Sequence, residues 1–208
     1  MIGSALYQSN HWDNMVPVTN WMDLKAKEIK LLVLHGGEDI SPSIYGQPVG
    51  YSHAPEQPSK RDRAEMALIN ACKEQGIPIL GICRGAQLLC AMDGGNLWQD
   101  VDAHGGTHPL IYKGEELTTN SAHHQMMIPA EGNQILAVSP NRSPFKYKDG
   151  EFDPIEDKND EPELVYFPRM NAIGVQGHPE WLSHKHPLNV LLKNLVGELL
   201  NVEISCGR

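Results

Sequence analysis

Residues 79–87 have the residue types and spacing of a nucleophile turn. They read Ile-Leu-Gly-Ile-Cys-Arg-Gly-Ala-Gln, which sets Cys83 between an apolar run and a helical pattern, with Gly81 and Gly85 on either side. A sharp strand-to-helix turn exposes its central side chain, as in the Gly-x-Ser-x-Gly elbow of hydrolases. Because a helix N-terminus favours the thiolate, we expect Cys83 to have a pKa below that of a free thiol. The N–H of Arg84 would then face a developing oxyanion.

Spacing alone leaves a second interpretation open, because a buried core position is among the commonest fates of a cysteine. Cys72 and Cys90 fall within helical patterns without the glycine frame, so we expect both in the core, and Cys206 carries no signal. The four cysteines show neither CxxC pairing nor the spacing of a disulfide framework. This usage indicates a reduced, cytoplasmic setting that leaves a thiol free for chemistry.

A cysteine nucleophile requires a histidine as base, and the histidine requires an acceptor that orients it. Among ten histidines, His178 directly follows a predicted strand, at the sheet edge where a strand-to-helix turn lies. Pro179 restricts His178 to extended backbone, in which residues i and i+2 point the same way. Glu180 is therefore predicted to accept from one ring nitrogen while the other faces Cys83. The alternative is a surface loop that happens to hold a histidine and a glutamate.

His123 and His124 form the other notable pair. Adjacent histidines can bind a metal, and His104 and His108 are candidates to join them. The pair lacks the i, i+4 spacing of a helical zinc site, and no cysteine or acid stands nearby to complete a ligand set. We therefore expect substrate contact or a role in loop structure, and no metal.

Apolar runs and helical patterns alternate along the chain, which predicts an α/β fold with a largely parallel sheet. Predicted strands cover residues 29–34, 77–82, 135–138, 163–167 and 172–176, and predicted helices cover residues 59–75, 84–92 and 187–201. Gly76 stands where the first of these helices needs its C-cap. The length of 208 residues suits one domain spanning residues 1–208.

Composition argues against several kinds of partner. The formal net charge is −9 and no dense cluster of Lys and Arg occurs, so we expect no nucleic acid. The run at residues 60–63, Lys-Arg-Asp-Arg, is predicted to be a solvated helix start. No apolar run approaches the ~20 residues that span a bilayer. Residues 1–14 lack the basic flank and apolar core of a secretory signal, so neither a membrane nor export is expected.

Five segments together resemble the class I glutamine amidotransferase-like family, and within it the γ-glutamyl-GABA hydrolase branch (peptidase C26), which also includes folate γ-glutamyl hydrolase. They are Leu-His-Gly-Gly-Glu-Asp-Ile-Ser-Pro at 34–42 with Tyr-Gly at 45–46, Gly-Ile-Cys-Arg-Gly-Ala-Gln at 81–87, Gly-Gly-Asn-Leu-Trp-Gln-Asp at 94–100, Asn-Ser-Ala-His-His-Gln at 120–125 and Gly-Val-Gln-Gly-His-Pro-Glu-Trp at 174–181. All five occur in the family's order, so a chance match is improbable.

The resemblance implies a flavodoxin-like three-layer sandwich, a cytoplasmic setting and neither a metal nor an organic cofactor. It implies that Cys83 is the nucleophile, His178 the general base and Glu180 its orienting acid. It further implies an oxyanion hole and a set of substrate contacts. The oxyanion hole would comprise Gly36, Gly37 and the N–H of Arg84, and the glutamyl group would meet Gln87 together with Ser121, His123, His124 and Gln125.

Three features depart from the family's pattern. The segment before Gly36 is short, so the first βα unit is expected to be reduced. Gly177 stands where an aromatic residue is common, which is expected to open or reshape the pocket. The acidic stretch at residues 149–163 has no counterpart that we can match. It belongs to a polar segment, residues 139–162, for which a solvated loop is favoured over a lid.

Three functions remain open at this stage. The leading one is a free-standing hydrolase that cleaves a small γ-glutamyl amine or peptide through a γ-glutamyl thioester. The second is a glutaminase subunit, which would pass ammonia from glutamine to a separate synthetase partner. The third is a non-catalytic binding protein, although no member of the predicted triad is missing. The sequence does not decide whether the chain forms a homodimer.

Overall fold

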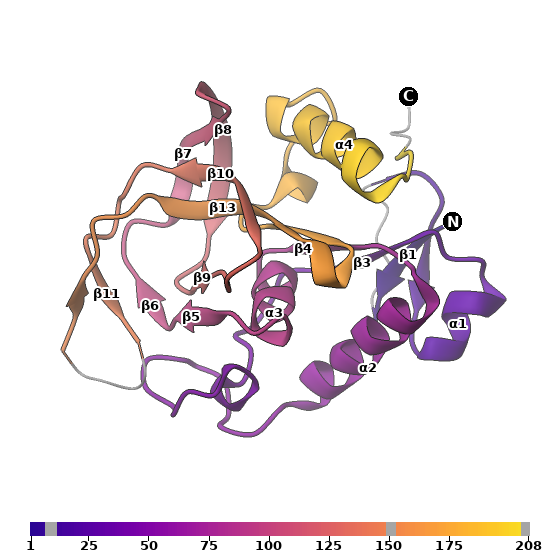
Figure 1. The fold of residues 1–208 in the computed structure, drawn as a ribbon, viewed down its shortest axis with the longest axis horizontal. Helices are drawn as coiled ribbons and strands as arrows, with labels where there is room; N and C mark the ends of the chain where they lie inside the picture. The colour runs from indigo at the N-terminus through magenta and orange to yellow at the C-terminus, as the bar shows by residue number, and fades with distance from the viewer. Residues whose placement is uncertain (7–11, 149–152, 205–208) are drawn as a thin grey trace.

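A nine-stranded sheet runs through the middle of the computed structural model, which describes residues 1–6, 12–148 and 153–204 (Figure 1). Its strands in spatial order are β2 (Met15–Val18), β1 (Ile2–Ala5), β3 (Leu31–Leu34), β4 (Ile79–Ile82), β14 (Ala172–Val175), β13 (Glu161–Phe167), β10 (Gln134–Ser139), β7 (Gly105–Tyr112) and β8 (Glu115–Ala122). The strands from β2 to β14 are parallel, and each strand from β13 onwards is antiparallel to its neighbours. The sheet is thus mixed, and the expected parallel arrangement holds for one half.

The central parallel strands are short and apolar because both of their faces are covered. Every residue of β3, β4 and β14 is buried. Val175 pairs with Ile82, and Leu34 pairs with Gly81, so the three strands end side by side. The loops that follow these strands therefore meet at one edge of the sheet.

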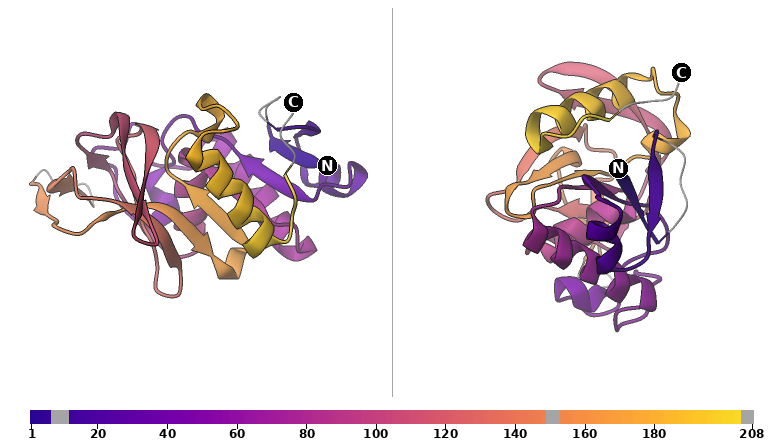
Figure 2. Two further views of the ribbon diagram at one scale, coloured as in Figure 1. Left: turned by 90° about the horizontal axis from the view of Figure 1, so that it is seen from above. Right: turned by 90° about the vertical axis from the view of Figure 1, so that its right-hand side faces the viewer.

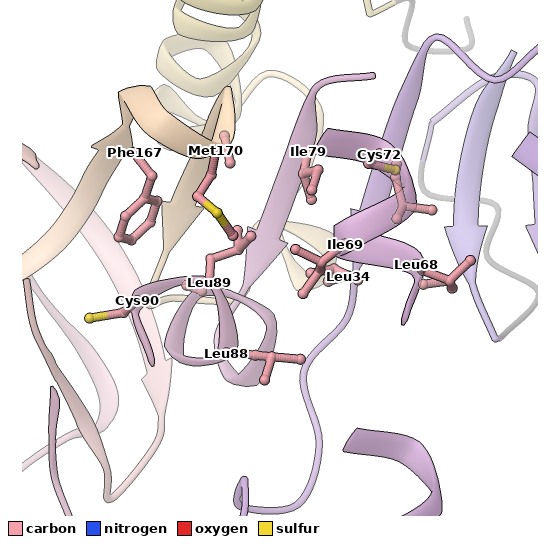
Figure 3. Close-up of a cluster of buried hydrophobic side chains, with 14 of the residues drawn as sticks. Leu34, Leu68, Ile69, Cys72, Ile79, Leu88, Leu89, Cys90, Phe167 and Met170 are labelled. Carbon is pink, nitrogen blue, oxygen red and sulfur yellow. The ribbon is translucent and has the colours of Figure 1, made fainter. Parts of the chain in front are cut away.

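Helices cover both faces of the sheet, which confirms the expected three-layer α/β architecture (Figure 2). On one side lie α1 (Trp21–Ala26), α2 (Lys60–Gln75) and α3 (Arg84–Met92), and on the other lies α4 (Pro187–Leu200). The first group packs through residues such as Leu68 and Leu89, which lie in one cluster with Phe167 of the sheet (Figure 3). On the opposite face, Leu192 of α4 packs in one cluster with Leu80. The described residues also form short 3-10 helices, namely η1 (Pro42–Tyr45), η2 (Pro168–Met170) and η3 (Pro179–Trp181).

Helix α2 begins and ends where its sequence signals predict. Ser59 caps the first turn in a capping box with Asp62, and Gly76 ends the helix in the left-handed conformation. The prediction of a solvated start holds for Lys60 and Arg63, which are exposed. It is wrong for the two residues between them, because Asp62 is fully buried and Arg61 is largely buried. Tertiary partners, described below, compensate these charges.

The polar segment at residues 139–162 is not a simple solvated loop. Its described part contains β11 (Phe145–Tyr147) and β12 (Ile155–Glu156), which pair with each other and with β6 (Asp100–Val101). Lys146 and Glu161 are fully buried there and form an ion pair of 3.3 Å. Residues 149–152 of the acidic stretch lie outside the described residues. A separate two-stranded sheet joins β5 (Asn96–Trp98) to β9 (Met126–Ile128).

The N-terminal unit is short, as its sequence suggested. Strand β2 follows β1 after a connection of residues 6–14, and α1 has only six residues. Asn20 caps α1 by accepting a hydrogen bond from the N–H of Met22. Among the described residues, no helix is both long and apolar enough to cross a membrane.

Candidate active site

Cys83 occupies a strained turn between β4 and α3. Its backbone has φ +48° and ψ −106°, a region that non-glycine residues rarely adopt. The flanking glycines are required by close packing: a Cβ on Gly81 would lie 2.6 Å from the carbonyl carbon of Gly85, and one on Gly85 would lie 2.5 Å from the oxygen of Leu34. The N–H of Cys83 donates to Val175 at 2.7 Å, which ties the turn to β14. The turn predicted from the sequence is therefore present.

The thiol of Cys83 is only 5% exposed. Burial raises its pKa to about 12, and the negative charges of Glu180, Glu163 and Asp39 act in the same direction. A hydrogen bond from the N–H of Arg84 opposes this shift without overcoming it. The expectation of a lowered pKa is wrong for the resting protein, because desolvation outweighs the helix N-terminus.

His178 and Glu180 form a close pair, with Nδ1 of the imidazole 2.7 Å from Oε1 of the carboxylate. A carboxylate only accepts, so Nδ1 carries the proton and Nε2 is left for chemistry. The predicted contact is present, but its predicted geometry is wrong. Residues 179–181 form the 3-10 helix η3, in which the N–H of Trp181 donates to the carbonyl of His178 at 3.2 Å.

Asn120 fixes the backbone of His178 from two sides. Its Nδ2 donates to the carbonyl of His178 at 2.8 Å, and its Oδ1 accepts from the N–H of His178 at 3.0 Å. Gly177 permits this approach, because a Cβ there would lie 2.6 Å from the carbonyl oxygen of Asn120 and still closer to Thr119. The glycine at this position therefore brings β8 against the histidine. Asn120 was not among the predicted site residues, although it lies in one of the family segments.

Gly36 is the place where the predicted residues converge. A Cβ on Gly36 would lie 2.7 Å from Cε1 of His178 and 3.5 Å from Cβ of Cys83. The three residues follow β14, β3 and β4, the strands that end side by side. The structure thus brings Cys83, His178 and Glu180 together around a glycine that has no side chain to obstruct them.

Arg61 holds the loop at Gly36 and Gly37 in place. Its Nη2 donates to the carbonyls of His35 and Gly36 at 3.0 Å each, and its Nη1 meets Glu38 at 2.8 Å. Gly37 has φ +150°, and any Cβ there would collide with this guanidinium. The loop is thereby fixed beside Cys83, where its backbone N–H groups are candidates for an oxyanion hole.

The side chain of Arg84 points into the protein, and only its backbone remains for the site. Its guanidinium is fully buried and donates to Asp62 and Glu65 of α2. Glu65 also accepts from Arg61 at 3.0 Å, and Asp62 accepts from Ser41 at 3.0 Å. This buried charge network joins α3 to α2 and to the glycine loop, and sequence reasoning missed it. The signal was present as two acids, three residues apart, on the inner face of a predicted helix.

Three of the predicted substrate contacts lie together. Nε2 of Gln87 and Nδ1 of His123 both reach the carbonyl of Gln125, at 3.0 and 2.9 Å. His123 is buried, and burial, reinforced by the charge of His104, lowers its pKa well below the ordinary value, so its ring is neutral. Ser121 instead donates to the carbonyl of His104 and so stabilises the neighbouring chain.

His124 lies apart from this group, in a partly exposed ion-pair cluster. Nε2 is 2.9 Å from Oδ1 of Asp39, and Nδ1 is 3.2 Å from Oδ1 of Asp100. The hydrogen bond to Asp39 raises the pKa of His124 despite its burial. The ring of His53 stacks on it at 4.6 Å. The loop that follows β3 is thereby joined to the end of β8.

The expectation that no acid stands near the histidines is also wrong. Glu161 and Glu163 of β13 are buried beside His104 and His108, with a 2.9 Å approach between Nε2 of His104 and Oε2 of Glu161. These residues are more than 50 positions apart, so the sequence did not show them as neighbours. Two groups of side chains could therefore hold a metal ion. One comprises His104, His108 and Glu163, and the other comprises Asp39, His53 and His124.

Comparisons with known proteins show the family and the fold of this chain. A model of the family Peptidase C26 matches residues 15–144. The glutamine amidotransferase-like protein YvdE of Lactococcus lactis is 31% identical over 190 residues, which are 81% of this chain and 71% of that protein. The γ-glutamyl-γ-aminobutyrate hydrolase PuuD of Escherichia coli K12 is 27% identical over 178 residues, covering 74% and 65%. A crystal structure of a glutamine amidotransferase from Thermotoga maritima has the same fold, with a TM-score of 0.53 at 16% identity and coverage of 96% and 88%.

Proposed function

Because this chain belongs to the peptidase C26 family, we propose that it is a free-standing thiol hydrolase that cleaves a γ-glutamyl amide bond. One observation carries the proposal. Cys83 stands on a strained strand-to-helix turn, and Gly36 separates it from the ring of His178, which Glu180 orients. A buried thiol beside an oriented imidazole is the arrangement that nucleophilic acyl transfer requires.

The resting pKa of Cys83 indicates how the reaction begins. A thiol with a pKa of about 12 is protonated at neutral pH, so the nucleophile must lose its proton as it attacks. Nε2 of His178 would take this proton while Sγ bonds to the γ-carbonyl carbon. The N–H of Arg84 and the backbone of Gly37 would then stabilise the oxyanion.

The second half of the reaction follows from the same groups. The imidazolium of His178 returns its proton to the departing amine, which leaves a γ-glutamyl thioester on Cys83. Water then attacks the thioester, and His178 takes its proton and passes it to the sulfur as free glutamate forms. Glu180 keeps the ring in its tautomer through both steps, because its carboxylate accepts only from Nδ1. We propose a cytoplasmic setting, in which a reduced thiol persists.

A glutaminase subunit is the second candidate. The amidotransferase name of YvdE favours it, and the same thioester chemistry applied to glutamine would release ammonia for a synthetase. The two candidates differ in what the chain does alone. A free-standing hydrolase turns over a γ-glutamyl amine without a partner, whereas a glutaminase subunit stays nearly silent until its synthetase binds.

Product release by the purified chain tests the proposal. We expect cleavage of γ-glutamyl-γ-aminobutyrate with little cleavage of glutamine, and we expect Cys83→Ala to abolish it. Cys72→Ala is the matched control, since Cys72 is a fully buried cysteine in α2 away from the turn. Equal loss in both variants would indicate a folding defect. Turnover that survives Cys83→Ala would contradict the proposal.

A further inference from the structure

A buried group of histidine and glutamate side chains lies behind the nucleophile turn. Each of His104, His108 and Glu163 offers one possible metal-ligand atom that lies within 4.8 Å of the other two, and all three residues are buried. His108 belongs to β7 and Glu163 to β13, which only β10 separates in the sheet. The group therefore joins strands that are not hydrogen-bonded to each other.

The tautomer of His108 is fixed by its surroundings. Its Nδ1 lies 3.1 Å from the carbonyl oxygen of Pro109, which only accepts, so Nδ1 carries the proton. The bare Nε2 faces Oε1 of Glu163 at 3.4 Å. Within the described residues, neither that nitrogen nor either carboxylate oxygen of Glu163 has a hydrogen-bond partner. Two buried acceptors thus face each other with no donor between them.

The 3.4 Å between Nε2 of His108 and Oε1 of Glu163 is the separation expected of two ligands of one metal ion. Zinc bonds of about 2.0–2.1 Å in a tetrahedral site place neighbouring ligand atoms roughly 3.3–3.4 Å apart. Metal-ligating histidines commonly donate their second ring N–H to a carbonyl or carboxylate, as His108 does to Pro109. The geometry at His108 and Glu163 meets both conditions.

His104 fits a third ligand position. Its Nε2 lies 2.9 Å from Oε2 of Glu161, and its Nδ1 has no hydrogen-bond partner among the described residues. Glu161 is itself held by the N–H of Ser143 at 3.0 Å and by Nζ of Lys146 at 3.3 Å. With Nδ1 as the ligand, Glu161 would orient the ring from behind, in the carboxylate–histidine–metal arrangement.

His123 supplies a further lone pair beside this group. Its Nδ1 is bound to the carbonyl of Gln125, which leaves Nε2 bare, and its ring lies 4.6 Å from that of His104. By contrast, His124 in the outer cluster has both ring nitrogens on carboxylates. The outer cluster is therefore satisfied without a metal, and the inner one is not.

We propose that His104, His108 and Glu163 bind one divalent metal ion, with zinc as the best match to two imidazoles and one carboxylate. The ion would have a structural role. It would tie β7 to β13 near the loop that carries His123 and Gln125. The backbone carbonyl of Glu163 accepts from the N–H of Gln176 at 2.8 Å, and Nε2 of Gln176 approaches Sγ of Cys83 at 4.0 Å.

A shared proton is the competing arrangement. Burial, reinforced by the charge of Glu161, raises the pKa of Glu163 well above its ordinary value, and the nearby Arg142 only partly opposes this. Without a metal, Glu163 would hold a proton and the site would be neutral. Zinc and the proton compete for the same oxygen and nitrogen lone pairs, so a direct binding measurement separates the two.

The experiment measures zinc in the complete chain, made without a histidine tag and dialysed against a weak chelator. We expect one equivalent of zinc per chain by elemental analysis. Glu163→Gln and His108→Asn should lose it, and Glu161→Gln should weaken binding by about 10–100-fold. His124→Gln is the matched control and should retain the ion.

Two results would overturn the proposal. The first is the absence of stoichiometric zinc in the unaltered chain at micromolar free zinc, which would assign the shared proton to Glu163. The second is loss of the ion in His124→Gln with retention in Glu163→Gln, which would move it to the outer cluster. Cobalt substitution of the unaltered chain covers the case in which the variants fail to fold. A four- or five-coordinate spectrum supports the site, and a six-coordinate spectrum contradicts it.

Discussion

Trp181 lies flat on the imidazole of His178, with ring centroids 3.8 Å apart and ring planes 3° apart. Glu180 holds the same ring at Nδ1, and Gly36 approaches it at Cε1. The imidazole is therefore fixed on three sides. Because the indole is 61% exposed, its stacking can be removed without opening a cavity in the core.

Replacing this indole tests whether stacking positions the base. We expect Trp181→Leu to lower kcat about tenfold with little change in KM, because a ring that rotates more freely spends less time aligned with Cys83. Trp181→Phe keeps an aromatic face, so its kcat should lie between those of the unaltered chain and of Trp181→Leu. Steady-state kinetics on a γ-glutamyl amine measure the effect. An unchanged kcat in the leucine variant would show that the stacking is incidental.

Replacing the orienting acid should leave the fold intact and remove most activity. An amide at position 180 can donate as well as accept, so Glu180→Gln no longer selects the tautomer with the proton on Nδ1. We expect a loss of about 10³–10⁴ in kcat with unchanged circular dichroism. Glu198→Gln, an exposed position on α4, serves as the control. Near-native turnover in Glu180→Gln would remove this carboxylate from the mechanism.

The buried charge network should be sensitive to the loss of one partner. Glu65 accepts from both Arg84 and Arg61, so Glu65→Gln leaves two buried or nearly buried guanidinium groups short of a carboxylate. We expect the free energy of unfolding to fall by about 3–5 kcal/mol. Urea titration measures it, with Glu74→Gln on the exposed face of the same helix as reference. A change below about 1 kcal/mol would mean that the network is only loosely coupled to the fold.

Alkylation of Cys83 should keep rising with pH. A pKa raised to about 12 means that the thiolate is scarce at neutral pH and increases through the alkaline range. We therefore expect the rate for the Cys83 peptide, followed by mass spectrometry with iodoacetamide, to show no plateau up to pH 10. A midpoint near or below the free-thiol value of about 8.5 would mean that the resting protein already activates the thiol.

The pairing of Asp39 with His124 should stabilise the protein over a limited pH window. The pKa of His124 is raised, so its contribution is present below about 6.5 and is lost as pH rises through the raised value. Burial opposes ionisation of Asp39, but bonds from His124 and His53 outweigh it and lower the pKa. The contribution of Asp39 is thus present above about 3.9 and is lost as pH falls through the lowered value.

A double-mutant cycle with Asp39→Asn and His124→Gln measures that pairing. We expect a coupling of about 0.5 kcal/mol at pH 5.5, since both side chains are partly exposed, and less at pH 9. Coupling that grows towards alkaline pH would contradict the pairing of a protonated His124 with an ionised Asp39. The two amide replacements keep side-chain size, so packing changes contribute little to the result.

Local signals in the sequence predicted what depends on local structure. Ser59 and Gly76 set the bounds of α2, and the glycines around Cys83 indicated the turn, because caps and close backbone approaches require particular residue types nearby. The pairing of His178 with Glu180 was also predicted. Its supporting geometry was not, because Pro179 begins a 3-10 turn rather than an extended segment.

Features that depend on distant partners could not be predicted in this way. Asp62 looked solvated because its partner Arg84 becomes a neighbour only when α2 packs on α3. Arg61 has Glu65 four residues later on the same helix, but its burial depends on the carbonyls of the distant glycine loop. The raised pKa of Cys83 likewise depends on how much of the protein covers it. Local patterns carry little information about such burial, since desolvation is a property of the assembled fold.

The most direct test of the account is to trap the covalent intermediate. The chain is mixed with a γ-glutamyl amine, quenched in acid within its first turnovers and digested. The mass of the peptide that contains Cys83 is then measured by mass spectrometry. We predict a mass increase equal to one γ-glutamyl group on Cys83, absent from Cys83→Ala and from the peptides of Cys72 and Cys90. Turnover of the substrate with no acyl group on Cys83 at any quench time, or with the group on another residue, would contradict the assignment of Cys83 as the nucleophile.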